Sequence, residues 1–184
     1  AEVMDEPVPV AEVAAPEEAV DAWPQKDLPA EAIISTPEAP AMGVKGALVK
    51  VGDKIPSVMV QAGGEQKGNR QVFPKPAPLS EVLGPGLSIL VGMPGAFTPT
   101  CDNKHLPGLF AATDKLNALG VNTVAVITTN DKYVNTGWAQ SVERCSGNNA
   151  TGVTMLSDVN AQLIEAIGLQ ADMGEDLSMR SKRF

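Results

Sequence analysis

Residues 94–101 read Pro94-Gly95-Ala96-Phe97-Thr98-Pro99-Thr100-Cys101 and stand between two segments of different pattern. The apolar run 87–91 before them is typical of a buried central strand, and a helical pattern after them runs to Gly120. A cysteine therefore lies where a strand turns into a helix. The first backbone N–H groups of a helix have no partner within it and stabilise an anion there. A thiol in this place ionises more readily than a free one, and the thiolate is the nucleophile.

The rest of the chain from residue 48 alternates between strand and helix patterns. We expect strands at 49–51, 58–60, 87–91, 123–128 and 153–158, the first of them followed by a turn, and helices at 100–119, 132–143 and 159–167. A loop or hairpin is expected at 61–71, an irregular segment at 72–78, one helical turn at 78–83, a polar turn at 145–152 and a loop at 172–178. This order indicates βαβ units and a largely parallel sheet, with the cysteine at a strand's carboxyl end.

Two helices have apolar positions that predict their buried faces. On the helix at 100–119 these are Leu106, Leu109, Phe110, Leu116 and Leu119, and on the helix at 132–143 they are Tyr133, Val134, Trp138 and Val142. Pro107 lies inside the first helix, and we expect a kink there because proline lacks a backbone donor.

Composition excludes several classes of function. The net charge is −8, which argues against nucleic acid as a partner. No apolar run approaches the roughly 20 residues of a transmembrane helix. Two cysteines do not make a disulfide framework, and with one histidine they are too few for a usual zinc site. No glycine-rich phosphate loop is present. We therefore expect neither a metal nor a bound cofactor.

Residues 1–47 differ from the rest of the chain. They hold seven of the 15 prolines and ten of the 22 acidic residues. Such a segment buries too little apolar surface to offset its chain entropy and is expected to be an extended arm. It does not resemble a transit peptide, which is rich in Arg and poor in acids. One hypothesis lays the arm along a partner in a larger assembly, anchored by Trp23, Ile33 and Ile34; the alternative packs it on its own domain.

At residues 94–108 the chain becomes recognisable. The motif PGAFTPTC, continued by Asp102-Asn103-Lys104-His105-Leu106-Pro107-Gly108, closely resembles the active-site segment of the type II (also called type 5) peroxiredoxins. These are thiol peroxidases with a thioredoxin-like fold, and the resemblance covers about residues 48–184. It implies an α/β domain with a central mixed sheet flanked by helices. A complete member continues with two more strands and a helix, so we expect a domain truncated at its C-terminus and a longer natural protein.

The resemblance also implies roles for individual residues. Cys101 would be the peroxidatic cysteine, which attacks a peroxide and becomes a sulfenic acid. Arg183 would stabilise the thiolate and the leaving oxygen, Thr98 would hydrogen-bond the peroxide, and Pro94 would shield the site from water. Arg180 is a candidate second cationic helper. For His105 we expect a packing or capping role rather than that of a base.

Cys145 departs from the family pattern. Members with a resolving cysteine tend to place it 25 residues after the first, where this chain has Val126, or far along in the C-terminal part. Cys145 is thus either a structural or incidental thiol, or an unusual resolving cysteine. If no cysteine of this chain resolves the sulfenic acid, its reduction needs an external thiol such as glutathione, glutaredoxin or thioredoxin. Asp102 is a smaller departure, because a carboxylate beside the cysteine opposes its ionisation.

Two hypotheses of function follow. The first is an enzyme, a thiol-dependent peroxidase for hydrogen peroxide and alkyl hydroperoxides, which the resemblance suggests forms a homodimer. The second is a structural or regulatory subunit of a larger, photosynthetic or other organellar assembly, tethered by residues 1–47. A plastid is favoured over a mitochondrion as the compartment, with the cytoplasm as the alternative.

Overall fold

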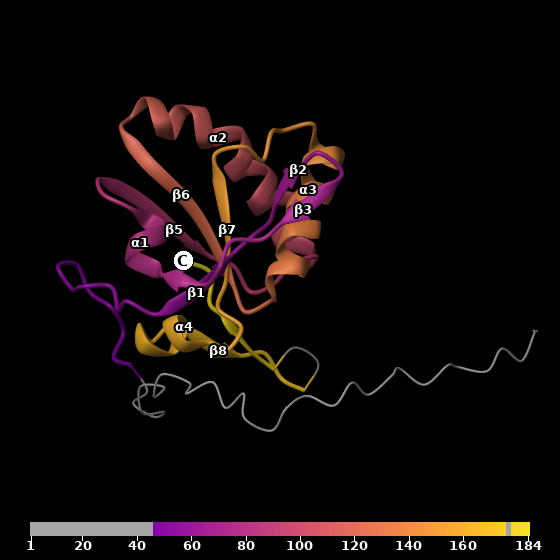
Figure 1. Cartoon of the computed structure of the whole chain (residues 1–184). Helices are drawn as coiled ribbons and strands as arrows, with labels where there is room; N and C mark the ends of the chain where they lie inside the picture. Colours follow the sequence, from indigo (N-terminus) through magenta and orange to yellow (C-terminus); the bar gives the residue numbers. More distant parts are fainter. Residues whose placement is uncertain (1–45, 176–177) are drawn as a thin grey trace, which may run out of the picture. The chain divides into compact units, whose positions relative to one another are not determined.

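The computed structural model describes residues 46–175 and 178–184, and the expectations for the arm lie outside these residues. In chain order the elements are β1 (Met59–Ala62), β2 (Glu65–Lys67), β3 (Arg70–Val72), β4 (Ala77–Pro78), α1 (Leu79–Leu83), β5 (Leu87–Gly92), the π-helical turn η1 (Cys101–His105), α2 (Leu106–Ala118), β6 (Val121–Thr128), α3 (Lys132–Ser146), β7 (Val153–Ser157), α4 (Gln162–Ala166), β8 (Gln170–Asp172) and β9 (Met179–Ser181). Figure 1 shows them along the chain.

The main sheet has the strand order β4-β1-β7-β6-β5. β5, β6 and β7 are parallel, whereas β1 pairs antiparallel with β7 and with β4. The sheet is therefore mixed, which confirms the expected fold class. β5 is the last strand in this order and is half buried over most of its length, so its predicted central, fully buried position was wrong for the part of the chain that the structure describes.

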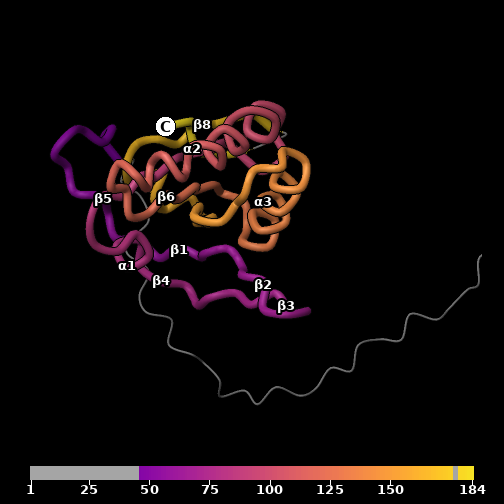
Figure 2. The backbone as a smooth tube through the Cα atoms, turned by 90° about the horizontal axis from the view of Figure 1, so that it is seen from above, coloured from indigo at the N-terminus to yellow at the C-terminus, as the bar shows by residue number. Residues whose placement is uncertain are grey.

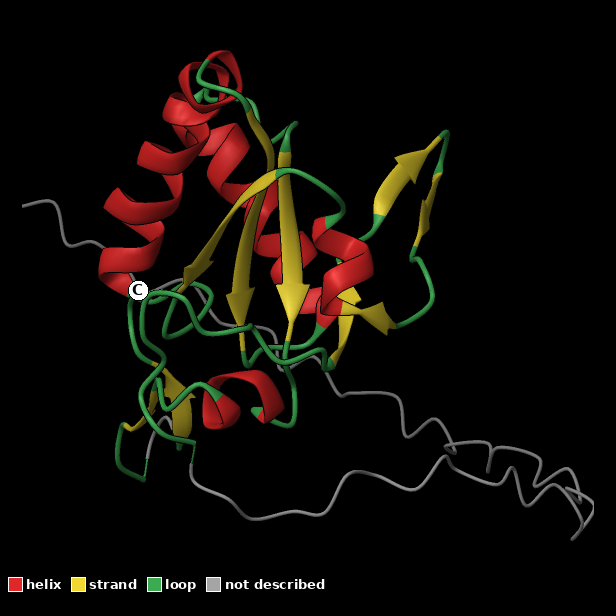
Figure 3. Cartoon of the chain, turned by 90° about the vertical axis from the view of Figure 1, so that its left-hand side faces the viewer, coloured by secondary structure: helices red, strands yellow, loops and turns green. Residues whose placement is uncertain are grey.

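The two faces of the sheet carry different cores because strand residues alternate between faces. Val126 faces one cluster with Cys101, Phe110, Trp138 and other side chains of α2 and α3. Ala125 and Ile127 face the other, which includes side chains of α1 and α4. The sheet is thus covered on both sides by helices, as Figure 3 shows.

The β2–β3 hairpin confirms the hairpin expected within residues 61–71, and it stands apart from the main sheet in Figures 2 and 3. The strand predicted at 49–51 was wrong. Residues 46–50 have no regular structure, but Gly46 and Val49 donate backbone hydrogen bonds to the carbonyls of Glu165 and Ile167. This segment is therefore held by α4, and only the turn at residues 51–52 agrees with the prediction.

The helices lie close to their predicted ranges, but not every apolar residue predicted for their buried faces is buried. Leu106 and Phe110 are buried, yet Leu119 is 78% exposed and Tyr133 is 63% exposed. Leu119 caps the end of α2, at the turn that leads into β6, and the Tyr133 ring packs against Phe73 instead of the core. The helix predicted at 159–167 begins only at Gln162, where buried Asp158 accepts the N–H groups of Leu163 and Ile164. Burial raises the pKa of the Asp158 carboxyl.

The segment after α4 contains an unpredicted pair of short strands. β8 and β9 pair antiparallel across the segment that the sequence predicted as a loop. Beyond them Phe184 and Gly92 exchange backbone hydrogen bonds of 3.0 and 3.3 Å, so the end of the chain lies against the end of β5. Gly92 allows this approach, since a Cβ there would lie 2.1 Å from the Phe184 ring.

Core packing gives a first prediction. Leu156 is fully buried on β7, so Leu156→Ala should lower the free energy of unfolding by about 2–5 kcal/mol, through lost burial and a residual cavity. Leu119→Ala makes the same chemical change at an exposed position and should shift it by about 0.5 kcal/mol or less. Urea denaturation followed by circular dichroism measures both. Equal losses would contradict the assignment of Leu156 to the core.

Candidate active site

Cys101 lies at the carboxyl end of β5, in the first turn of a helix. The helix begins at Pro99, and the cysteine side chain is fully buried. The Asp102 backbone donates to the Thr98 carbonyl at 2.8 Å, which closes the first helical turn over the loop. Phe97 in this loop has a φ of 58°, a left-handed conformation that is uncommon for a non-glycine residue, and its ring is 55% exposed. The expected strand-to-helix position of the cysteine is confirmed.

The loop before Cys101 is held by the carboxyl end of β6. The Ala96 N–H donates to the Asn130 side-chain oxygen at 2.9 Å, and the Asn130 N–H donates to the Thr128 hydroxyl at 3.0 Å. Within the loop, the Thr98 hydroxyl donates to the Gly95 carbonyl at 2.9 Å. Asn130 lies two residues after the end of β6, and no role was predicted for it. Polar residues that follow a buried parallel strand are the signal that points to it.

Arg183 contacts Cys101 although it lies far from it in the sequence. Its Nη2 donates to the Cys101 Sγ at 3.3 Å, although the two residues are 82 positions apart. The β8–β9 pair and the contact between Phe184 and Gly92 position the arginine beside the cysteine. The arginine places a positive charge and a hydrogen-bond donor beside a buried sulfur. The structure thus brings together the cysteine and the arginine that the resemblance paired.

His105 contacts the other terminal nitrogen of the same guanidinium. Its Nδ1 is 2.5 Å from the Arg183 Nη1, and because arginine has no acceptor, the imidazole accepts this bond with its proton on Nε2. Burial, and then the positive charge of Arg183, lower the pKa of His105. The histidine is therefore neutral near pH 7 and orients the guanidinium. The prediction of a packing or capping role missed this contact.

The structure describes no contact between the Cys101 sulfur and the other predicted residues, Thr98, Pro94 and Arg180. Thr98 and Pro94 are half buried in the loop before Cys101. The Thr98 hydroxyl, bonded as a donor to Gly95, keeps lone pairs that can accept a further hydrogen bond. The Arg180 Nη1 donates to the Thr129 hydroxyl at 3.2 Å and lies 3.9 Å from the place where a Cβ on Gly95 would stand. A second guanidinium therefore borders the active-site loop.

Cys145 lies in the last turn of α3 and is exposed, so its predicted place in a polar turn was wrong. The helix ends two residues later, at Gly147, whose φ of 69° suits a left-handed cap. Cys145 borders a cavity of about 190 Å³ together with Ser141, Val142 and Ser146 of α3 and Asp102, Asn103 and Pro107 of the opposite wall. No disulfide joins it to Cys101, because both cysteines are free.

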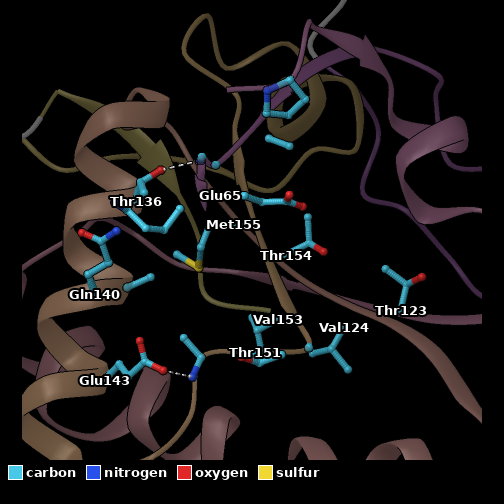
Figure 4. A pocket seen from close by; sticks show the side chains of 18 of the residues that line it. Glu65, Thr123, Val124, Thr136, Gln140, Glu143, Thr151, Val153, Thr154 and Met155 are labelled. Carbon is cyan, nitrogen blue, oxygen red and sulfur yellow. Dashed lines mark hydrogen bonds between the residues drawn. The ribbon is translucent and has the colours of Figure 1, made fainter. Parts of the chain in front are cut away.

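A larger cavity of about 720 Å³ lies elsewhere, between β1, β2, β6, β7 and α3 (Figure 4). No residue of the loop or turn at 94–105 lines it, and its ionisable residues are Glu65 and Glu143. The Glu143 carboxylate accepts the Ala150 N–H at 3.1 Å, and the Thr136 hydroxyl accepts the Gly64 N–H at 2.9 Å. This cavity holds no nucleophile and is not the site of the cysteine chemistry.

Two further observations bear on the expected absences. Within residues 46–175 and 178–184, no group of three or more His, Cys, Asp or Glu side chains is placed to hold a metal ion. In the same part of the chain, no helix is long and apolar enough to cross a membrane.

The contact between His105 and Arg183 gives a second prediction. His105 is the only histidine, so an NMR titration reads it alone, and its pKa should lie below the ordinary 6.5. Arg183→Gln removes the positive charge, which is the smaller cause, but leaves the burial of the imidazole. The pKa of His105 should therefore rise but stay below 6.5. Lys182→Gln, at the exposed neighbour, is the control and should leave it unchanged.

The same depressed pKa has a consequence for stability. The unfolded chain binds the His105 proton more tightly than the folded one. This contribution to the free energy of unfolding should therefore fall as pH drops through 6.5 toward the folded pKa. If the pKa of His105 were unchanged in Arg183→Gln, this result would contradict the contact between His105 and Arg183.

Comparison with known proteins agrees with this geometry. A family model described as Redoxin matches residues 50–184. Peroxiredoxin-2E-2, chloroplastic, from Oryza sativa subsp. japonica is 33% identical over 141 residues, which are 75% of this chain and 59% of the relative. The chain thus spans less than two thirds of that relative's length.

Solved structures show the same likeness. Reduced Prx3 from Vibrio vulnificus, in complex with hydrogen peroxide, is 29% identical with a TM-score of 0.61, over 74% of this chain and 78% of that one. Peroxiredoxin 5 from Alvinella pompejana is 30% identical with a TM-score of 0.58, over 73% and 79%. Together with the buried cysteine and its arginine, these likenesses show that the chain belongs to the redoxin family and, within it, to the type II, or type 5, peroxiredoxins.

Proposed function

We propose that the protein is a thiol-dependent peroxidase that reduces hydrogen peroxide and alkyl hydroperoxides through Cys101. The observation that carries this proposal is the 3.3 Å contact between the Arg183 Nη2 and the Sγ of a fully buried cysteine in the first turn of a helix. The family to which the chain belongs supports it, as does the relative solved with hydrogen peroxide.

In the first step the Cys101 thiolate attacks the terminal oxygen of the peroxide. The S–O bond forms as the O–O bond breaks, and the leaving oxygen takes a proton to become water or an alcohol. Cysteine is oxidised to sulfenic acid and the peroxide is reduced. Arg183 is placed to stabilise the thiolate and the negative charge that develops on the leaving oxygen.

Three neighbours support that step. His105 accepts a hydrogen bond from Arg183, so the guanidinium is held in one orientation without a competing carboxylate. The Thr98 hydroxyl can accept a hydrogen bond from the peroxide because its own proton is given to the Gly95 carbonyl. Pro94, half buried in the same loop, presents no N–H and limits the access of water.

We propose an external thiol as the reductant. A thiol attacks the sulfenic sulfur, which gives a mixed disulfide and water, and a second thiol then releases Cys101. Glutathione with glutaredoxin, or thioredoxin, has the required chemistry. Cys101 and Cys145 are both free thiols, and no contact between them is described, which favours a spectator role for Cys145. Its alternative role as a resolving cysteine is tested below.

The proposal extends to the compartment and the assembly. The rice relative is named as chloroplastic, which favours a plastid over a mitochondrion or the cytoplasm. The exposed Phe97 ring beside the active-site loop is a candidate contact for a homodimer. The tethered subunit of a larger assembly depends on residues 1–47, which lie outside the described part of the chain.

Substitutions at the site test the peroxidase. Cys101→Ser should abolish peroxide consumption. Arg183→Gln should slow the reaction of Cys101 with hydrogen peroxide by about 10²–10³-fold, the usual cost of removing one donor to a developing charge. Lys182→Gln is the matched control for a nearby exposed cation and should leave the rate unchanged. Stopped-flow kinetics with hydrogen peroxide and reductant-coupled assays measure both steps.

The reductant is tested in the same assays with dithiothreitol, glutathione with glutaredoxin, and thioredoxin. Cys145→Ser should keep turnover with the donor that serves the unsubstituted protein. Loss of thioredoxin-dependent turnover in Cys145→Ser would instead make Cys145 the resolving cysteine. No peroxide consumption by the unsubstituted protein with any donor would exclude the enzyme and leave the tethered subunit.

A further inference from the structure

The residue after the reactive cysteine is bonded to α3, which belongs to the same core cluster as Cys101. The Trp138 Nε1 donates to the Asp102 Oδ1 at 2.7 Å. Trp138 is fully buried in the middle of α3, whereas Asp102 follows Cys101 in the turn η1. In the described part of the chain this is the hydrogen bond that joins η1 to α3. Its acceptor is a carboxylate, so it belongs to the stronger class of hydrogen bonds.

The backbone of the turn is held less firmly than an α-helix. η1 is a π-helical turn, in which the Leu106 N–H donates to the Cys101 carbonyl one residue beyond the α-helical partner. Pro107 follows and has no N–H, so it gives no bond to the Asn103 or Asp102 carbonyl. The turn is also held by the Asn103 amide, which donates to the Pro99 carbonyl, and by the two contacts of Arg183, but the bond that Asp102 accepts from Trp138 is the one that ties it to α3.

The packing of the turn is also incomplete. The cavity of about 190 Å³ lies between Asp102, Asn103 and Pro107 on one wall and Ser141, Val142, Cys145 and Ser146 of α3 on the other. Beyond Trp138 the turn therefore does not fill the space against α3. The cavity therefore leaves space for movement directly beside Asp102 and Asn103 of the turn.

We propose that Asp102 is a positioning residue: its hydrogen bond to Trp138 latches the Cys101 turn in the closed state and sets how often the turn opens. This inference rests on the proposed peroxidase function and names the regulation of the same site. It also gives a reason for a carboxylate beside the reactive cysteine, where the charge alone is unfavourable.

The two half-reactions need different states of the turn. Attack on peroxide needs the closed state, in which Cys101 contacts Arg183. Reduction needs an open state, because a thiol has to reach a sulfur atom that is fully buried. While the turn stays closed, a second peroxide can transfer an oxygen to the sulfenic acid, which gives a sulfinic acid and water or an alcohol. A stronger latch favours the first step and this over-oxidation, and a weaker latch favours reduction.

The opening itself can be measured without peroxide. In a Cys145→Ser, Trp23→Phe background Cys101 is the only thiol and Trp138 the only tryptophan. The rate at which 5,5′-dithiobis(2-nitrobenzoate) labels Cys101 reports opening, and Trp138 fluorescence reports its surroundings. Asp102→Ala should label roughly ten-fold faster, because a buried indole N–H loses its acceptor. Asp102→Asn keeps an acceptor oxygen without the charge and should stay within about two-fold of the background.

Kinetics should show the two half-reactions moving in opposite directions. In Asp102→Ala the rate constant for attack on hydrogen peroxide should fall while that for reduction of the sulfenic acid by thiol rises. A higher peroxide concentration should be needed for half-maximal sulfinic acid, which mass spectrometry measures. Trp138→Phe removes the same donor and should reproduce both shifts, and the double variant should add little to either single one.

Three results would overturn the latch. Asp102→Asn behaving like Asp102→Ala would assign the effect to charge. A fall in both rate constants would indicate general damage to the site. Unchanged labelling in Asp102→Ala would show that the bond does not hold the turn. If the unsubstituted protein consumes no peroxide, the peroxidase proposal fails, and the labelling series still decides whether Asp102 holds the turn closed.

Discussion

A buried asparagine on α3 holds together the elements on which the site is built. The Asn135 side chain donates to the Leu156 carbonyl at 3.0 Å and to the Ser157 hydroxyl at 2.9 Å, and it accepts from the Thr128 hydroxyl at 2.8 Å. The carboxyl ends of β6 and β7 are thereby tied to the first turns of α3. Since the asparagine is fully buried, an unpaired amide there would cost about 1–3 kcal/mol. Through Thr128 and Asn130 the same network reaches Ala96 in the active-site loop.

This anchoring contrasts with the turn that follows it. The loop before Cys101 is fixed by hydrogen bonds to β6, whereas the turn after it has π-helical backbone bonding, a proline that donates nothing and a cavity at its side. Rigid support on one side and loose packing on the other allow a buried sulfur to keep its place beside Arg183 and still be released. Pro107 was predicted to kink the helix, and the structure has a π-helical turn, wider than an α-helical one, directly before it.

The sequence predicted those features that local pattern determines. The run 123–128 became most of β6, and the motif around Cys101 indicated the fold family and the place of the cysteine between a strand and a helix. It could not show that His105 would meet Arg183, because that contact joins positions 78 residues apart. β8 and β9 were missed because strands of three residues have too few positions to show alternation. Leu119 and Tyr133 follow the apolar pattern, but local chain geometry points them away from the sheet.

Arg183 shows why a site can depend on its least regular segment. It lies in no strand or helix, and its side chain reaches the sulfur because the backbone on both sides of it is bonded. The Lys182 N–H donates to the Leu169 carbonyl at 2.7 Å, and Phe184 pairs with Gly92. The neutral imidazole of His105 then fixes the far end of the guanidinium. A carboxylate in that place would hold the arginine more tightly but would cancel the charge that the thiolate needs. Histidine with a lowered pKa orients the guanidinium and leaves its charge for the sulfur.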